Sequence, residues 1–341
     1  MKKFTHALIA CKAVQRLQSV ELSDKNKPYA NFLYDWFAAH KDKVIQGAWY
    51  PDKVICDMST SHVYKYTPVA DLAAYTDLLR AGQPFKTEKA SKFPATSLFR
   101  GLPQTSLQCA IGQRSPLYYL PYTIDSGNNL PERCEALSHS VVDNLRIREA
   151  EPTGSSLLPT DDHIALVLFM LSHYVADAHM PMHCDSRQDD FIGFNIHAEA
   201  EDRWNREVVK YYKINIEKQN FAMDAVTGFP QLFDDGTYQD SILYAVDQKL
   251  AARPFRIGYG EANDNVREYI LAVSQYSYLN SYAWLPPGLS ADHLDRERLQ
   301  CASGLTFKEM STAALADAID AVARVWLHDL RRYGIWKEQN R

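Results

Sequence analysis

Two stretches of the sequence place a histidine and a carboxylate four residues apart, a spacing that suits metal ligands. The first stretch holds His173 and Asp177, and the second holds His197 and Glu201. Residues at this spacing lie on the same face of an α-helix, so each pair would present an imidazole beside a carboxylate. Zinc and similar divalent ions take these ligand types in catalytic sites, where one position stays open for water.

A third histidine lies between the two pairs. Pro181 should end the helix that carries His173 and Asp177, which allows the chain to turn and return His183 toward the same pocket. Residues 164–171 are apolar on every face, so this helix should be buried, where an ionised aspartate is costly unless it is paired or bound to metal. One such pair alone is more often a buried hydrogen bond, but two pairs with His183 between them favour a metal site.

Further candidates lie upstream. His6 falls in the first turn of an expected helix, and Asp52 follows residues 47–51 (Gly-Ala-Trp-Tyr-Pro) and precedes His62 by ten residues. Taken alone, each is more often a helix-start or loop residue than a ligand. Asp57 is closer to His62 in the sequence and is the second choice, after Asp52, for a metal ligand in this segment. The other histidines have no partner at ligand spacing, and His179 is expected to pack or to support the site: His40, His139, His163, His179, His293 and His328.

Helices must position these residues, because helical periodicity dominates the chain and strand-like alternation is nearly absent. Apolar residues at helical spacing predict a helix over residues 5–18, capped by Thr5, and another that begins at Pro28. Further helices are expected over residues 69–79, 131–148, 164–181, 197–213, 237–252, 263–280 and 307–333. The sequence therefore predicts an all-α fold in which residues 1–341 form a single multi-helix domain.

Residues 82–128 interrupt this pattern with five prolines and four glycines. The segment is locally basic and rich in aromatic residues. Long irregular insertions of this kind are usually functional or disordered. Two interpretations stay open: a lid that meets an anionic, partly apolar substrate, or a solvated insertion whose aromatic side chains pack inward.

The composition limits the function classes. The chain has 341 residues, 46% of them hydrophobic and 23% charged, with a formal net charge of −5. These values exclude collagen-like, coiled-coil and disordered classes, and the negative charge disfavours broad binding to nucleic acid.

Six cysteines without a CxxC pair are expected to be buried free thiols. We find no signal peptide and no apolar run long enough to span a membrane, so we expect a cytoplasmic protein without stable membrane insertion, or a secreted or periplasmic one if its start is processed.

The order and spacing of these residues resemble a known family. The run His173-x3-Asp177-x5-His183, followed by His197-x3-Glu201, is similar to the ligand run of the zinc-dependent phospholipase C family. That family shares its all-α fold and a three-metal site with single-strand-specific nucleases. The start Thr5-His6-Ala-Leu-Ile-Ala and the segment from Gly47 to His62 resemble other characteristic segments of its bacterial members. Residues 82–128 would be an insertion relative to the family.

The resemblance implies two to three zinc ions. One would be held by Asp52, His62, His173 and a bridging Asp177, and a second by His183, His197 and Glu201. A third would be held by His6, Asp177 and the backbone amine and carbonyl of the first residue. The family usually has a tryptophan there, exposed by signal cleavage, whereas this chain has Met1. Activity would depend on whether Met1 completes that third site.

The resemblance also implies hydrolysis of a phosphate ester by a metal-activated water, with Asp52 as ligand and catalytic residue. Glu201 stands where the nucleases usually have aspartate, which favours a phospholipase C-like phosphodiesterase acting on a phospholipid or a related ester. A single-strand-type nuclease or nucleotidase on the same fold is the first alternative, so a nucleic acid substrate stays possible. A non-catalytic metal-binding relative is the second. The sequence does not indicate the oligomeric state.

Overall fold

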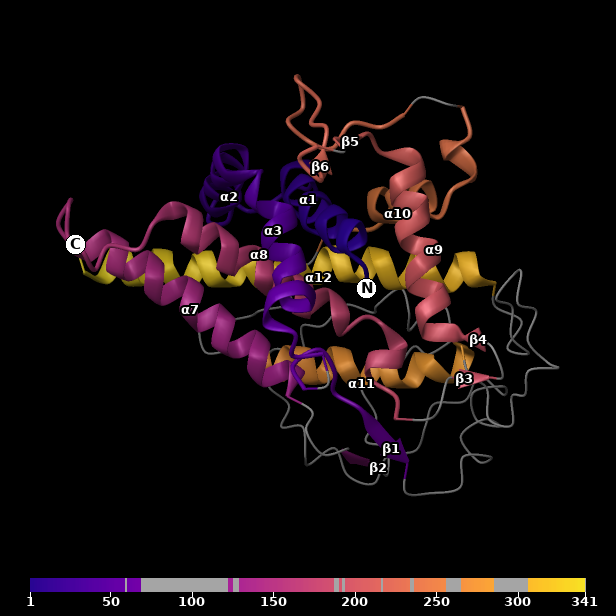
Figure 1. The fold of residues 1–341 in the computed structure, drawn as a ribbon. Helices are drawn as coiled ribbons and strands as arrows, with labels where there is room; N and C mark the ends of the chain where they lie inside the picture. Colours follow the sequence, from indigo (N-terminus) through magenta and orange to yellow (C-terminus); the bar gives the residue numbers. More distant parts are fainter. Residues whose placement is uncertain are drawn as a thin grey trace.

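Long helices make up most of the chain, which confirms the predicted all-α class (Figure 1). The computed structural model describes residues 1–58, 60–68, 122–124, 129–186, 190–191, 194–215, 217–233, 236–255, 265–284 and 306–340. Its helices are α1 (Lys3–Ser19), α2 (Lys27–His40), α3 (Lys43–Tyr50), α7 (Leu130–Ala150), α8 (Asp161–Asp177), α9 (Ile196–Tyr211), α10 (Ile242–Ala252), α11 (Val266–Trp284) and α12 (Phe307–Gln339). The prediction of one domain over residues 1–341 stays a prediction.

Strands occur only as short antiparallel pairs within the described residues. The pairs are β1 (Tyr66–Pro68) with β2 (Tyr122–Ile124), β3 (Asp190–Phe191) with β4 (Phe194–Asn195), and β5 (Ile214–Asn215) with β6 (Asn220–Phe221). The first pair brings residues 68 and 122 together. The expected helix over 69–79 and nearly all of the expected insertion at 82–128 lie outside the described residues.

Helix α8 is the centre of the fold, and it packs against α1, α3, α7 and α12. Its residues from Phe169 to Asp177 are all buried, as the apolar sequence before His173 predicts. The long α12 crosses behind it, and Trp326 donates from Nε1 to the carbonyl oxygen of Leu168 at 3.0 Å. In Figure 1, α1, α2 and α3 lie above α12, whereas α11 lies below it. The two ligand candidates of α8 therefore lie in the buried part of this helix.

Helix α3 was not predicted: helices were expected to begin at Pro28 and at residue 69, but none directly before Asp52. It packs on α8 through Gly47, where an added Cβ would lie 2.4 Å from Phe169 Cβ and 2.8 Å from the carbonyl oxygen of Leu166. Glycine thus permits the close approach of the two helices. A π-helical turn, Pro51–Ile55, continues α3, so Asp52 lies on a helical turn rather than in a loop.

The observed ends of several helices differ from the predicted ends. Thr5 is not a cap, because α1 begins at Lys3 and Thr5 is buried within it. The backbone N–H of Phe4 donates to Asn205 Oδ1 at 3.1 Å and holds this first turn against α9. Helix α8 begins earlier than predicted because Thr160 caps it by accepting from the backbone N–H of His163 at 3.2 Å. Helix α10 begins later than predicted, where Ser241 accepts from the backbone N–H of Tyr244.

The structure also bears on the predictions about the cysteines and about membrane-spanning helices. Cys11, Cys134 and Cys184 are buried free thiols as expected, but Cys56 is exposed because it closes the π-helical turn at the surface. Cys109 and Cys301 lie outside the described residues. Among the helices of the described ranges, none is both long enough and apolar enough to cross a membrane.

Candidate metal centre

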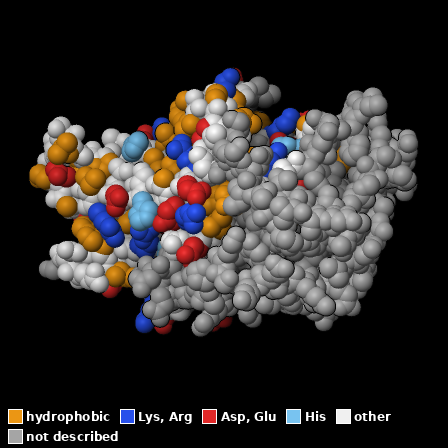
Figure 2. All heavy atoms as spheres, turned by 90° about the horizontal axis from the view of Figure 1, so that it is seen from below, with side chains coloured by type: hydrophobic (Ala, Val, Ile, Leu, Met, Phe, Trp, Pro, Cys, Tyr) orange, Lys and Arg blue, Asp and Glu red, His pale blue; other side chains and the backbone are white. Residues whose placement is uncertain are grey.

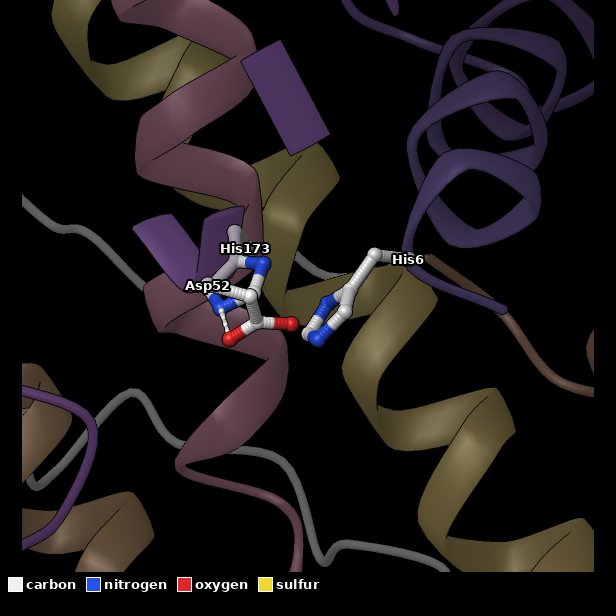
Figure 3. A group of neighbouring side chains, drawn as sticks. All are labelled: His6, Asp52 and His173. Carbon is white, nitrogen blue, oxygen red and sulfur yellow. Dashed lines mark ion pairs between the residues drawn. The ribbon is translucent and has the colours of Figure 1, made fainter. Parts of the chain in front are cut away.

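The predicted ligands come together from five separate parts of the chain. They belong to α1, the π-helical turn after α3, the segment before β1, α8 with the turn that follows it, and α9. Figure 3 shows three of them, with the side chains of His6, Asp52 and His173 facing one another from three elements. They form three groups whose potential ligand atoms lie within 4.8 Å of one another: His6, Asp52 and His173; His62, His173 and Asp177; and His183, His197 and Glu201.

His173 is held in one orientation by the backbone of α3. Its Nδ1 donates to the carbonyl oxygen of Ala48 at 2.7 Å, and this leaves Nε2 facing the site. Nε2 lies 3.2 Å from Asp177 Oδ2 and 3.4 Å from Asp52 Oδ1. A histidine that donates its other ring nitrogen to a carbonyl is the usual arrangement of a metal ligand, because the bond sets both the tautomer and the ring direction.

The N-terminal segment adds His6 and the amino group of Met1. The ring of His6 stacks on that of His173 at a centroid distance of 3.7 Å, and His6 Nε2 lies 3.4 Å from Asp177 Oδ1. The amino group of Met1 lies 3.0 Å from Asp177 Oδ1 and 2.7 Å from Glu201 Oε1. Met1 and His6 thus both reach Asp177, the carboxylate that the resemblance assigns to a third metal.

His62 lies between two carboxylates. Its Nε2 is 3.3 Å from Asp52 Oδ1, and its Nδ1 is 3.2 Å from Asp57 Oδ1. Backbone hydrogen bonds hold the segment on either side: Leu130 N donates to Val63 O at 3.2 Å, and Tyr64 N donates to His183 O at 3.0 Å. The loop that carries His62 is thereby tied to the turn that carries His183.

The third group lies at the start of α9. His197 Nε2 is 2.9 Å from Glu201 Oε1 and 3.0 Å from His183 Nε2. Asn195 caps the helix by accepting from the backbone N–H of Ala198 at 2.6 Å, which sets the position of His197 in the first turn. The side chain of His197 is 31% exposed, whereas those of Asp177 and His173 are almost completely buried. The cluster therefore opens to solvent at this group.

The carboxylates of the site are charged at neutral pH. Burial alone would raise the pKa of Asp177, but the amino group of Met1 and the rings of His183 and His173 outweigh it and hold this pKa well below its usual range. Burial also opposes ionisation of Glu201, and the amino group of Met1 with His183 and His197 lowers its pKa well below the usual value. Anionic oxygens concentrated in a buried site are what a divalent cation requires.

The histidines divide between two protonation states. Burial lowers the pKa of His183 to about 4 despite the nearby Asp177, so this ring is neutral at pH 7. For His173 burial acts in the same direction, but Asp177 and Asp52 outweigh it and raise the pKa to about 9. Metal binding requires neutral imidazole, so a cation at this site would replace the proton of His173.

Several buried polar atoms of the cluster make no hydrogen bond to any described residue. They are both ring nitrogens of His6, both ring nitrogens of His62, Nε2 of His173, Oδ2 of Asp177 and Nδ1 of His183. Buried polar groups are nearly always hydrogen-bonded, so a concentration of unpaired ones calls for an explanation such as an ion. The donor set of imidazoles and carboxylates fits zinc or a similar divalent metal, and the residues can therefore hold a metal ion.

The remaining histidines are not part of these groups where the structure describes them. His40 pairs with Asp162 at 3.0 Å and His139 with Glu135 at 2.9 Å, both at the surface. His179 is buried, its Nδ1 bonds to the carbonyl oxygen of Val175 at 3.1 Å, and burial lowers its pKa to about 4. His328 is buried and His163 is exposed, whereas His293 lies outside the described residues.

Comparisons with protein-family models, with curated proteins and with solved structures find no match to this chain. The geometry of this cluster and the spacing of its residues in the sequence therefore indicate what the protein can do.

Proposed function

We propose that the protein is a zinc-dependent phosphoric ester hydrolase, a phosphodiesterase that acts as the phospholipase C family does. One observation carries the proposal: Asp177 contacts His6, His173, His183 and the amino group of Met1, so three groups of ligands meet around one buried carboxylate. Zinc ions held here would lower the pKa of a water molecule and neutralise charge on the oxygens of a phosphate group.

Residues of the chain would orient the attacking water and admit the substrate. Burial opposes ionisation of Asp52, but His173 and His62 outweigh it and lower the pKa of this carboxyl. The carboxylate is thus charged at neutral pH and able to accept a hydrogen bond from an attacking water, which orients that water. The partly exposed side chain of His197 would let a substrate reach the cluster from solvent. The burial of His173 and Asp177 would keep these ligands in fixed positions.

The surface beside Asp52 supports an ester with an apolar part. Val54, Ile55 and Met58 follow Asp52 closely in the chain, and their exposed fractions are 60%, 38% and 55%. Exposed apolar side chains beside a polar site are typical of a surface that receives an apolar ligand. On the described part of the face in Figure 2, positive and negative side chains alternate, without an extended basic surface of the kind that nucleic acid favours. A phospholipid or a related amphiphilic ester is therefore the proposed substrate.

Metal analysis followed by three parallel assays tests this proposal. The purified protein would be analysed for zinc and then incubated with phosphatidylcholine vesicles, single-stranded DNA and a chromogenic phosphodiester. We expect two to three zinc ions per chain and hydrolysis of the lipid and of the chromogenic ester. Turnover of DNA without turnover of lipid would replace the phospholipase by the nuclease alternative. Bound zinc without turnover of any ester would favour a non-catalytic metal-binding protein.

A further inference from the structure

Asp57 lies beside the cluster but in none of its three groups of described residues. Its Oδ1 is 3.2 Å from Nδ1 of His62, while Nε2 of the same ring faces Asp52. Asp57 and Asp52 therefore lie on opposite sides of one imidazole. Nε2 of this ring thus faces a member of the cluster, whereas Nδ1 faces Asp57.

Two further side chains hold the carboxylate of Asp57. The hydroxyl of Tyr174 donates to it, at 3.0 Å from Oδ1 and 3.1 Å from Oδ2. Arg133 approaches from α7, with Nε 3.7 Å from Oδ2, and its guanidinium lies over the ring of Tyr174 at 5.3 Å. The carboxylate thus has a buried phenol from α8 and a cation from α7 as partners outside the three ligand groups.

The backbone explains how two aspartates five residues apart reach the same ring. The N–H of Cys56 donates to the carbonyl oxygen of Pro51 at 2.8 Å and closes the π-helical turn, and Cys56 itself has a left-handed φ of 55°. An ordinary α-helix would continue past this point and carry Asp57 away from Asp52. Turns of this kind inside helices occur often at functional sites.

We propose that Asp57 is a positioning residue for zinc: with zinc bound, it would accept the proton of His62 Nδ1, which lies 3.2 Å away and makes no hydrogen bond to a described residue, and would so direct Nε2 of that ring at the metal. A histidine ligand must be neutral, and the hydrogen bond of its other nitrogen determines which nitrogen is free to bind. Asp57 is not itself a ligand in this arrangement. The inference rests on the proposed function, because it assumes that the cluster holds zinc.

Zinc affinity and a cobalt spectrum test the inference without an activity assay. Wild-type protein, Asp57→Asn and Asp57→Ala would be titrated with zinc against a competing chelator. Asp162→Asn is the matched control, because Asp162 also pairs with a histidine ring, His40, but at the surface. The visible absorption of each protein loaded with Co²⁺ then reports on the ligands of the folded site. Tyr174→Phe removes one support of Asp57 and provides a milder variant.

We expect Asp57→Ala to bind its weakest zinc ion about 10- to 100-fold less tightly than the wild type, with a smaller loss in Asp57→Asn and in Tyr174→Phe. The cobalt spectrum should change in the Asp57 variants and stay the same in Asp162→Asn. A purely structural role would lower the unfolding temperature without changing the spectrum of the folded protein, and that result would overturn the inference. Wild-type zinc affinity in every Asp57 variant would overturn it alone, whereas absence of zinc from the wild type would contradict the proposed function as well.

Discussion

The ring of His173 donates to the carbonyl oxygen of Ala48 at 2.7 Å, and this bond joins α8 to α3 at the point where both helices lead into the cluster. It directs Nε2 of His173 at Asp177 and Asp52, and it depends on how closely the two helices approach. Gly47, the residue before Ala48, sets that distance because its Cα packs directly against Phe169.

Gly47→Ala is expected to destabilise the protein and to weaken metal binding. The added methyl group would lie 2.4 Å from Phe169 Cβ, so α3 must move away from α8. Overpacking of this kind costs about 1–3 kcal/mol of the free energy of unfolding. Urea unfolding and a zinc titration measure the two effects. Gln46→Ala changes the exposed neighbour on the same helix and should leave both nearly unchanged; equal behaviour of the two variants would show that the close approach is not required.

Asp177→Asn is expected to lose more zinc than Glu201→Gln. Asp177 lies near His6, His173 and His183, whereas among the described residues of the cluster Glu201 pairs with His183, His197 and the amino group of Met1. Elemental analysis after gel filtration gives the zinc content of each variant. Asp161→Asn, a surface aspartate paired with Arg148, should keep the wild-type content. Equal loss in the two ligand variants would show that Asp177 is not the shared ligand.

Asp320→Ala is expected to lower the free energy of unfolding by about 3–5 kcal/mol, because it removes the carboxylate that pairs with the buried guanidinium of Arg16. The Nε of Arg16 on α1 lies 3.0 Å from Asp320 Oδ1, and Arg253 lies 2.8 Å from Oδ2. This contact ties α1, which carries His6, to α12. Asp24→Ala is the control, since the Lys27–Asp24 pair is largely exposed and its removal should not change the urea midpoint measurably. A midpoint unchanged in Asp320→Ala would argue against the buried network.

Asp329 should make stability depend on pH. Burial between α7 and α12 raises the pKa of its carboxyl to about 8, despite the hydrogen bond from Ser138 and the nearby Arg332, and Glu135 adds to the rise. The native state then binds a proton more tightly than the unfolded chain, whose carboxyl titrates near pH 4. The stabilisation is complete below about pH 4 and is lost as the pH rises through about 8.

Asp329→Asn keeps an acceptor for the hydroxyl of Ser138 and removes the titration. Urea unfolding between pH 5 and pH 8 compares the two proteins. We expect the wild type to lose stability relative to the variant as the pH rises across this range. Parallel stability curves for the two proteins would show that Asp329 does not titrate in the native state.

The sequence predicts most of the cluster because several ligands are placed by local geometry. His173 with Asp177 and His197 with Glu201 follow from helical spacing alone, and Pro181 marks the turn that returns His183. The helix boundaries are less well predicted, because caps such as Thr160 and Ser241 compete with other polar residues nearby. The all-α class follows from periodicity and is confirmed.

The different positions of Asp52 and Asp57 around the ring of His62 could not be predicted from their spacing in the sequence. Helix α3 is short, and its position depends on the contact of Gly47 with α8, which is remote in sequence. The π-helical turn that separates the roles of Asp52 and Asp57 has no recognisable sequence pattern, and the choice between the two carboxylates becomes clear only from the ring of His62 between them. The carbonyl oxygen of Ala48 and the hydroxyl of Tyr174 were missed for the same reason, since only tertiary contacts reveal them.

The central claim is that zinc in this cluster hydrolyses phosphate esters. Its most direct test is to strip the protein with a chelator, return zinc in steps and follow hydrolysis of a chromogenic phosphodiester at each step. We predict no activity in the stripped protein and recovery that reaches its maximum at two to three zinc ions per chain, with no recovery in Asp177→Asn. Full activity in the zinc-free protein, or no hydrolysis by the fully loaded one, would contradict the account.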